Sequence, residues 1–128
     1  MELKDSQGVV VAKLSSGKIN SAKGDILGRV EKGRVSDAAG KTVGFVKQTT
    51  VVDAENAGKA LYSDRELSTY SGAAMYKFSG TTVTDYADKA VLRLSEDYSK
   101  LVEELVAYIV FFSKLWKDTS KIYTSPAY

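Results

Sequence analysis

KINSAKGDILGRVEKG (residues 18–33) is followed without a gap by RVSDAAGKTVGFVKQT (residues 34–49), and the two stretches are copies of one 16-residue pattern. Apolar residues, turn residues and glycines fall at the same places in both copies. The matched pairs are Ile19/Val35, Ser21/Asp37, Ala22/Ala38, Gly24/Gly40, Leu27/Val43, Gly28/Gly44 and Val30/Val46. This period decides the fold, and we number its positions from Lys18 and Arg34 as position 1.

Each copy has the composition of a β-hairpin. Asp37-Ala38-Ala39-Gly40 fits a type I turn, in which the Asp side chain accepts backbone hydrogen bonds and the Gly takes a positive φ. The run from Lys41 to Val46 is the expected return strand. Gly44 within it indicates a β-bulge or a close approach by another part of the chain.

The same period extends in both directions. Position 2 is apolar throughout, as Leu3, Ile19, Val35, Val51, Leu67 and Val83. Position 13 is apolar as well, as Leu14, Val30, Val46, Tyr62, Phe78 and Leu94. Turn residues about every eight positions between short β-branched runs are typical of an antiparallel meander. The sequence therefore predicts a mainly β, α+β protein, with an array of antiparallel hairpins over residues 2–84.

After residue 84 the period changes to that of a helix. Ala87, Val91, Leu94, Tyr98, Leu101, Leu105, Tyr108, Phe112 and Leu115 are separated by steps of four and three. Two interpretations compete for residues 85–95. Either a sixth hairpin is completed and the helix begins at Ser95, or the helix begins with Asp85 as its N-cap. We favour the second, because no helix breaker interrupts residues 86–98. A single domain of 1–128 then comprises hairpins (2–84), a long helix (85–118) and a tail (119–128), which is either a loose end or one more strand.

The helix contains eight consecutive apolar residues from Leu105 to Phe112. A membrane span needs about 20 such residues, so this run predicts burial on more than one side. Either the domain encloses the helix completely, or a second copy covers the face that the hairpins leave open. We favour a homo-oligomer formed through this helix, because an uncovered apolar face would be larger than monomers usually expose. The predicted interface residues are Val102, Val106, Ile109, Val110 and Phe111.

Composition excludes several classes of function. The chain of 128 residues has no Cys and no His, which removes thiol chemistry, histidine acid–base chemistry and the usual zinc sites. A net charge of +2 is too small to indicate nucleic-acid or membrane binding. Residues 1–8 contain no apolar signal-peptide core, which predicts a cytoplasmic protein, although a chain from which a signal peptide had been removed would look the same.

No catalytic constellation is visible, and we predict neither a cofactor nor a metal site. The recurring turn aspartates supply one carboxylate each, whereas a calcium loop supplies several. Aromatic and basic residues do mix in the later copies, and such groups on a sheet can stack bases or sugars. Tyr70, Tyr76 and Lys77 are therefore the candidate ligand contacts.

The unit V-x-D-A-x-G-x-x-V-G-x-V, followed by a C-terminal helix, resembles the small bacterial proteins grouped as the four-fold β-flower domain. The resemblance covers residues 2–84 and implies a rosette of hairpins with no established activity. The segment GRVSDAAGKTVGFV (residues 33–46) also resembles a strand pair of the PRC-barrel, whose relatives serve as adaptor modules. Neither resemblance brings functional residues with it.

These observations favour a non-enzymatic structural or adaptor module that self-associates and that has an unidentified protein partner. The alternative is a module that binds a small ligand, a glycan or a nucleic acid on the aromatic and basic hairpin surface.

Overall fold

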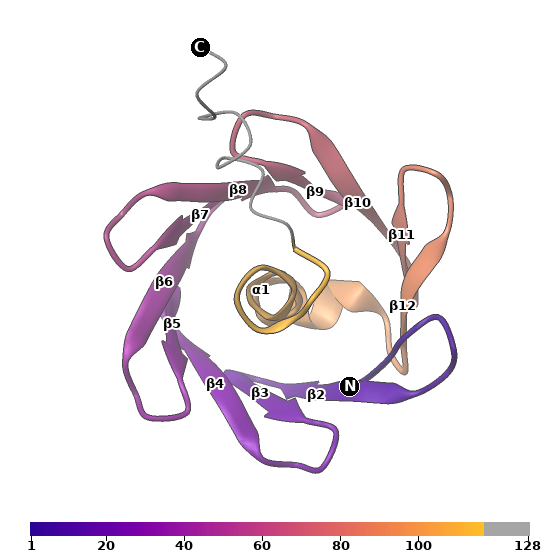
Figure 1. The fold of residues 1–128 in the computed structure, drawn as a ribbon, viewed down its shortest axis with the longest axis horizontal. Helices are drawn as coiled ribbons and strands as arrows, with labels where there is room; N and C mark the ends of the chain where they lie inside the picture. Colours follow the sequence, from indigo (N-terminus) through magenta and orange to yellow (C-terminus); the bar gives the residue numbers. More distant parts are fainter. Residues whose placement is uncertain (117–128) are drawn as a thin grey trace.

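The protein, seen in a computed structural model that describes residues 1–116, is a closed antiparallel barrel with a helical segment inside it (Figure 1). Consecutive strands are neighbours all the way round, and β1 pairs with β12 to close the ring. The strands are β1 (Glu2–Lys4), β2 (Val10–Ser15), β3 (Lys18–Ser21), β4 (Ile26–Glu31), β5 (Arg34–Asp37), β6 (Thr42–Lys47), β7 (Thr50–Asp53), β8 (Gly58–Tyr62), β9 (Glu66–Thr69), β10 (Ala74–Ser79), β11 (Thr82–Asp85) and β12 (Ala90–Leu94).

The odd-numbered strands begin 16 residues apart, so that each 16-residue copy forms one hairpin. Every hairpin has a β-bulge at the same place, where the pairing register shifts by one residue. A bulge bends its strand and increases the local twist. In Figure 1 the hairpin tips accordingly project outward around the ring. The extra residues stand at position 10 of the copies: Val11, Leu27, Val43, Lys59, Met75 and Val91.

The turn at the tip of each hairpin is held by its own first residue. The Asp37 carboxylate accepts hydrogen bonds from the backbone N–H groups of Ala39 and Lys41, at 3.0 and 2.9 Å. Asp5, Asp53 and Asp85 bind their turns in the same way. The prediction that these aspartates serve their own turns is therefore confirmed.

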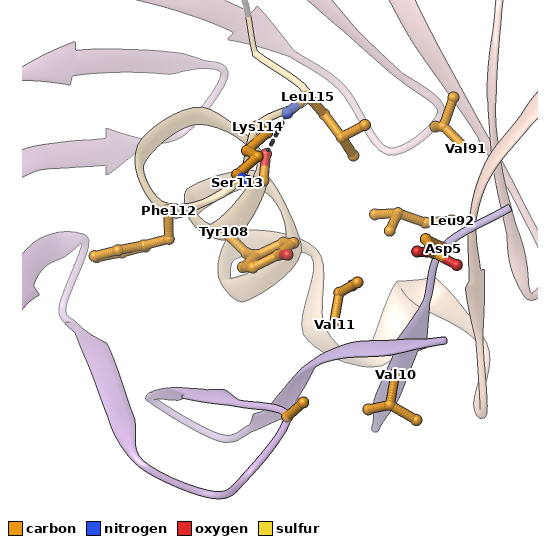
Figure 2. A pocket seen from close by; sticks show the side chains of 11 residues that line it. Asp5, Val10, Val11, Val91, Leu92, Tyr108, Phe112, Ser113, Lys114 and Leu115 are labelled. Carbon is orange, nitrogen blue, oxygen red and sulfur yellow. Dashed lines mark hydrogen bonds between the residues drawn. The ribbon is translucent and has the colours of Figure 1, made fainter. Parts of the chain in front are cut away.

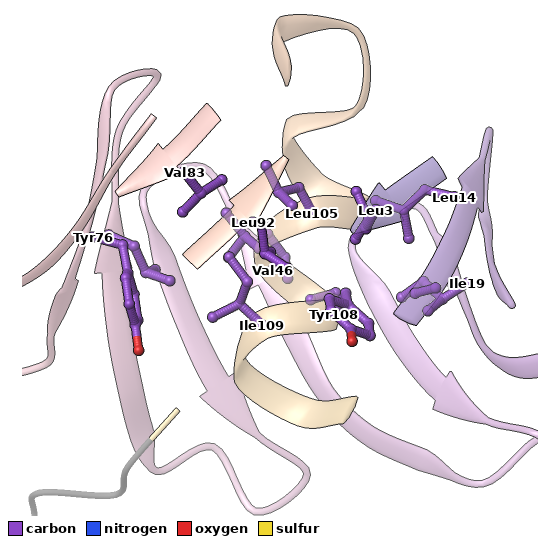
Figure 3. Packing of buried hydrophobic residues seen from close by; sticks show 14 of the residues in the cluster. Leu3, Leu14, Ile19, Val46, Tyr76, Val83, Leu92, Leu105, Tyr108 and Ile109 are labelled. Carbon is purple, nitrogen blue, oxygen red and sulfur yellow. The ribbon is translucent and has the colours of Figure 1, made fainter. Parts of the chain in front are cut away.

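The inner surface of the barrel is built from positions 2 and 13, as the period predicted. All six residues at position 2 are fully buried. At position 13 five of the six are buried, and Tyr62 is partly buried. Figure 3 shows Leu3, Leu14 and Ile19 packed around the helix from one side and Val83 and Leu92 from another. The barrel thus encloses a continuous apolar core with the helix at its centre.

The predicted long helix over 85–118 is wrong. Residues 82–94 complete a sixth hairpin, and the helical segment begins only after it, as a 3₁₀ turn (Tyr98–Leu101), α1 (Val102–Ala107) and a π-helical turn (Tyr108–Phe112). Asp97 caps the first turn by accepting a hydrogen bond from the N–H of Ser99, at 2.9 Å. The predicted tail (119–128) lies outside the described residues.

The burial of α1 also changes the interpretation of the predicted oligomer interface. Val106 and Ile109 are fully buried inside the chain's own barrel, so their assignment to an intermolecular surface is wrong. Val102, Val110 and Phe111 are partly buried and pack against the same core. The barrel itself covers the apolar run. Of the two interpretations of this run, the structure thus agrees with the one in which the domain encloses its own helix.

Two glycines fix the place of the helical segment within the barrel. A Cβ atom on Gly28 would overlap the ring of Phe112, and one on Gly44 would overlap the ring of Phe111. These glycines occupy position 11, where the other copies have Ala12, Ala60, Tyr76 and Leu92. Accordingly α1 contacts β2, β4 and β6 most extensively, whereas the larger Tyr76 and Leu92 fill the opposite side. The close approach predicted at Gly44 is confirmed, together with the bulge beside it.

Candidate ligand-binding pocket at the barrel mouth

A pocket of about 470 Å³ opens at the end of the barrel where the hairpin tips flare outward (Figure 2). It lies between the last turn of the helical segment and the wall formed by the first and sixth hairpins. Cavities of 300–1,000 Å³ are the usual size for small-molecule sites. The pocket exists because Phe111 and Phe112 are directed toward Gly44 and Gly28, which leaves the space beside the opposite wall unfilled.

The wall of the pocket is mainly aliphatic and comes from the barrel. Val11 and Val91 are bulge residues, and Leu92 follows directly at position 11. The bulge turns the position 10 side chain toward the mouth, where a regular strand would direct it outward. Val10 and Ala22 extend the apolar lining, and the Asp5 carboxylate stands at its edge.

The helical segment supplies the other side of the pocket. Tyr108, Phe112 and Leu115 provide apolar surface, and Figure 2 shows Tyr108 facing the same space as Val11 and Leu92. Burial raises the pKa of the Tyr108 hydroxyl, which keeps it neutral and able both to donate and to accept a hydrogen bond. π-Helical turns are rare in proteins, but those that occur are often found at functional sites. In this turn, Tyr108 and Phe112 both line the pocket.

Two further polar residues follow the π-helical turn. The Ser113 hydroxyl donates to the carbonyl of Ile109 at 2.7 Å and accepts from the N–H of Leu115 at 3.1 Å. Both bonds close the end of the helical segment, so this hydroxyl is already engaged. Lys114 is exposed at the rim, with its ammonium group free to stay hydrated.

The structure does not bring the three predicted ligand contacts together. Tyr76 is buried inside the barrel, and its hydroxyl donates to the carbonyl of Leu115. Burial and, secondarily, the charge of Asp85 raise the pKa of Tyr76. Tyr70 is 53% exposed and lies over Gly58 on the preceding hairpin. Neighbouring strand residues point to opposite faces, so Lys77 lies outside the barrel while Tyr76 lies inside.

Lys77 belongs instead to a polar cluster on the outer surface of the fifth and sixth hairpins. Its ammonium group lies 2.8 Å from the Asp88 carboxylate and 5.0 Å from the centre of the Tyr86 ring. The hydrogen bond from Lys77 lowers the pKa of Asp88. The Tyr86 hydroxyl donates to Glu66 at 2.6 Å, and this bond raises the pKa of Tyr86. These groups interact with one another on the outer surface, away from the pocket.

The sequence did not identify the pocket residues, because their patterns are those of buried strand residues or of the apolar face of a helix. One signal was present. Position 10 is apolar in five of the six copies although it is adjacent to the apolar position 11, and two consecutive inward residues on a strand indicate a bulge. Among the described residues, no group of three or more His, Cys, Asp or Glu side chains could hold a metal ion.

Comparison with protein-family models gave no match, and neither did comparisons with curated proteins and with solved structures. The resemblances to the four-fold β-flower domain and to the PRC-barrel therefore stay predictions. Within residues 1–116, no helix has the length and apolar character needed to cross a bilayer.

Proposed function

We propose that this protein is a non-enzymatic binding module that takes a small, largely apolar molecule into the pocket at the barrel mouth. The observation that carries the proposal is the pocket itself, which has eight apolar or aromatic residues in its lining and a volume of about 470 Å³. The absence of His and Cys from the sequence supports a binding role over a catalytic one.

The driving force for binding is burial of apolar surface. Transfer of apolar surface from water contributes about 25 cal/mol per Å². The wall is a closed hydrogen-bonded sheet, so the site is largely formed before a ligand arrives. Preorganisation of this kind reduces the entropy that binding costs.

The repeat offers a matched pair of variants that tests the proposal. Val91 lines the pocket, whereas Val43 occupies the same position in the third hairpin and is not part of the lining. The probe is Prodan, an uncharged fluorophore without N–H or O–H donors whose emission shifts to the blue in apolar surroundings. We expect Prodan to bind the native protein and Val43→Phe, and to bind Val91→Phe at least about tenfold more weakly, since the added ring fills the cavity.

Circular dichroism and thermal melting first establish that both variants are folded. If Prodan binds equally to Val91→Phe and to the native protein, its site lies elsewhere and the proposal fails. It also fails if the folded native protein does not bind the probe at all.

The structural or adaptor role favoured by the sequence stays a prediction, and so does self-association. Burial of Val106 and Ile109 removes the argument that the helix needs a second chain to cover it. An adaptor function would therefore have to use the outer surface of the hairpins.

A further inference from the structure

We infer that the ligand is an uncharged aromatic ring compound carrying an N–H or O–H group, and that this group donates a hydrogen bond to the Asp5 carboxylate. This inference rests on the proposed function and specifies its ligand. It follows from which polar groups at the pocket are already engaged and which are not.

Asp5 is a fixed acceptor. Its Oδ1 atom accepts hydrogen bonds from the N–H groups of Gln7 at 2.9 Å and Val9 at 3.0 Å, which hold the carboxylate in one orientation. The second oxygen, Oδ2, takes part in neither bond, and an ionised carboxylate can only accept. Asp5 is half-buried at the edge of the pocket, where a hydrogen bond to a charged group is worth more than in bulk water.

The other polar groups do not compete for this role. Both bonds of the Ser113 hydroxyl are internal to the helical segment. Lys114 is exposed, so moving its ammonium group to a ligand would cost hydration. The neutral Tyr108 hydroxyl can either donate or accept a hydrogen bond, so it does not select between ligands that donate and ligands that accept. Among the polar residues that line the pocket, the one held rigidly is therefore an acceptor, and it selects a donor.

The remaining lining specifies the body of the ligand. Asp5 and Lys114 carry opposite charges, so the lining as a whole does not favour a net charge on the ligand. Tyr108, on the helical segment, presents its aromatic ring to the same space as Val11 and Leu92 on the barrel wall. Aromatic rings pack against one another in offset or edge-to-face arrangements. A flat ring between these two sides buries both of its faces.

Indole and benzofuran provide the test, because they share a shape and differ in having N–H or oxygen at one ring position. Each is used to displace bound Prodan from three proteins: the native chain, Asp5→Asn and Asp37→Asn. Asp37 holds the third hairpin's turn through the same two bonds but is not part of the pocket lining, so it reports any effect on the turn alone.

We expect indole to displace Prodan at about three- to tenfold lower concentration than benzofuran in the native protein and in Asp37→Asn. In Asp5→Asn, whose amide keeps an oxygen for the turn but replaces Oδ2 by a donor, this preference should disappear. If indole and benzofuran displaced Prodan from the native protein equally well, the inference would be overturned. The proposed function would still be supported in that case, because Prodan itself binds in the pocket. Stronger displacement by benzoate or benzylammonium than by indole would overturn the uncharged ligand.

Discussion

The seventh residue of every hairpin has a positive φ, whatever its identity. Gly8, Gly24, Gly40 and Gly72 have φ between +81° and +96°, and the same place is taken by Asn56 at +69° and Asp88 at +63°. Asn and Asp are the residues other than Gly that most readily adopt this left-handed conformation. The backbone of the turn thus constrains this position more strongly than any side-chain contact does.

Substitution at this position therefore tests backbone strain alone. No atom lies within 4 Å of a Cβ placed on Gly40, so space is available there but the φ of +87° disfavours a β-branched residue. We expect Gly40→Val to lower the free energy of unfolding by about 1–2 kcal/mol more than Ala38→Val in the same turn. Urea titrations of the two variants measure the difference, and coincident midpoints would show that the turn tolerates a branched side chain.

Because two tyrosines are buried, the free energy of unfolding should depend on pH in the alkaline range. Burial raises the pKa of Tyr76 and Tyr108 above the ordinary value of 10.0. Because the folded-state pKa is the higher one, the stability that these hydroxyls contribute is fully present below pH 10 and is lost as the pH rises through the folded-state pKa. We expect the urea midpoint of unfolding to decrease as the pH is raised above about 10. In Tyr108→Phe this decrease should be less steep.

The exposed Tyr70 provides the control for this experiment, as Tyr70→Phe. Midpoints in urea at several alkaline pH values, measured on all three proteins, give the three slopes. If the slope of Tyr108→Phe equals that of the native protein, ionisation of Tyr108 does not drive the alkaline loss.

At the scale of elements, hairpins could be predicted from the sequence and the start of the helix could not. Positions 2 and 13 repeat their apolar residues in register, which is sufficient to predict the strands and their inner face. The sixth hairpin was missed because Asp88 replaced the expected glycine and because Val91 and Leu94 also fit a helical period. Short apolar patterns fit both periods, and what decides here is the pairing of β12 with β1 at the other end of the chain.

The candidate site was harder to predict than the fold, for a related reason. Tyr76 and Tyr108 stand in segments whose patterns indicate core, and both are indeed buried. Whether such a residue borders a cavity depends on how completely the helical segment fills the barrel. That is a property of side-chain volumes at position 11 around the whole ring, which no local pattern contains.

The contact between hairpin and helical segment yields a prediction of its own. A methyl group on Gly28 would overlap both the Phe112 ring and the carbonyl oxygen of Ser36. We expect Gly28→Ala to cost about 2–3 kcal/mol, as for other overpacked cores. Ala60→Gly at the same position of the fourth hairpin should cost only about 1 kcal/mol.

Combining Gly28→Ala with Phe112→Leu identifies the source of that cost. The smaller side chain relieves the contact with the ring but not the contact with the backbone, so the double variant should recover part of the stability lost in Gly28→Ala. Thermal or urea unfolding of the four proteins gives the coupling energy. Strict additivity would mean that the two residues do not meet as described.

At the scale of the whole molecule, the barrel wall encloses a helical segment from the same chain. Leu105, Val106, Ala107 and Ile109 are completely buried, and the core that they join includes residues from all six hairpins. The interior is therefore a folding core, and the outer surface is left for any association with other proteins.

This arrangement predicts the behaviour of a charge placed on the helix. Ile109→Glu would bury an unpaired carboxylate in the core, which costs several kcal/mol, so we expect the variant to unfold at all protein concentrations. Light scattering and circular dichroism on the native protein and the variant distinguish the alternatives. A variant that stays folded while a native dimer becomes a monomer would restore the helix as an intermolecular interface.

The pairing of β1 with β12 joins Leu3 to Leu94, whereas every other strand pairs with a neighbour in sequence. Loop-closure entropy opposes such a distant pairing until much of the chain is ordered, so this junction should form late, after the rate-limiting step of folding. Leu94→Ala should then accelerate unfolding and leave the refolding rate nearly unchanged, whereas Val46→Ala, within a local hairpin, should slow refolding. Stopped-flow measurements in urea test this order of events, and a refolding rate reduced in proportion to the stability lost in Leu94→Ala would instead place ring closure in the transition state.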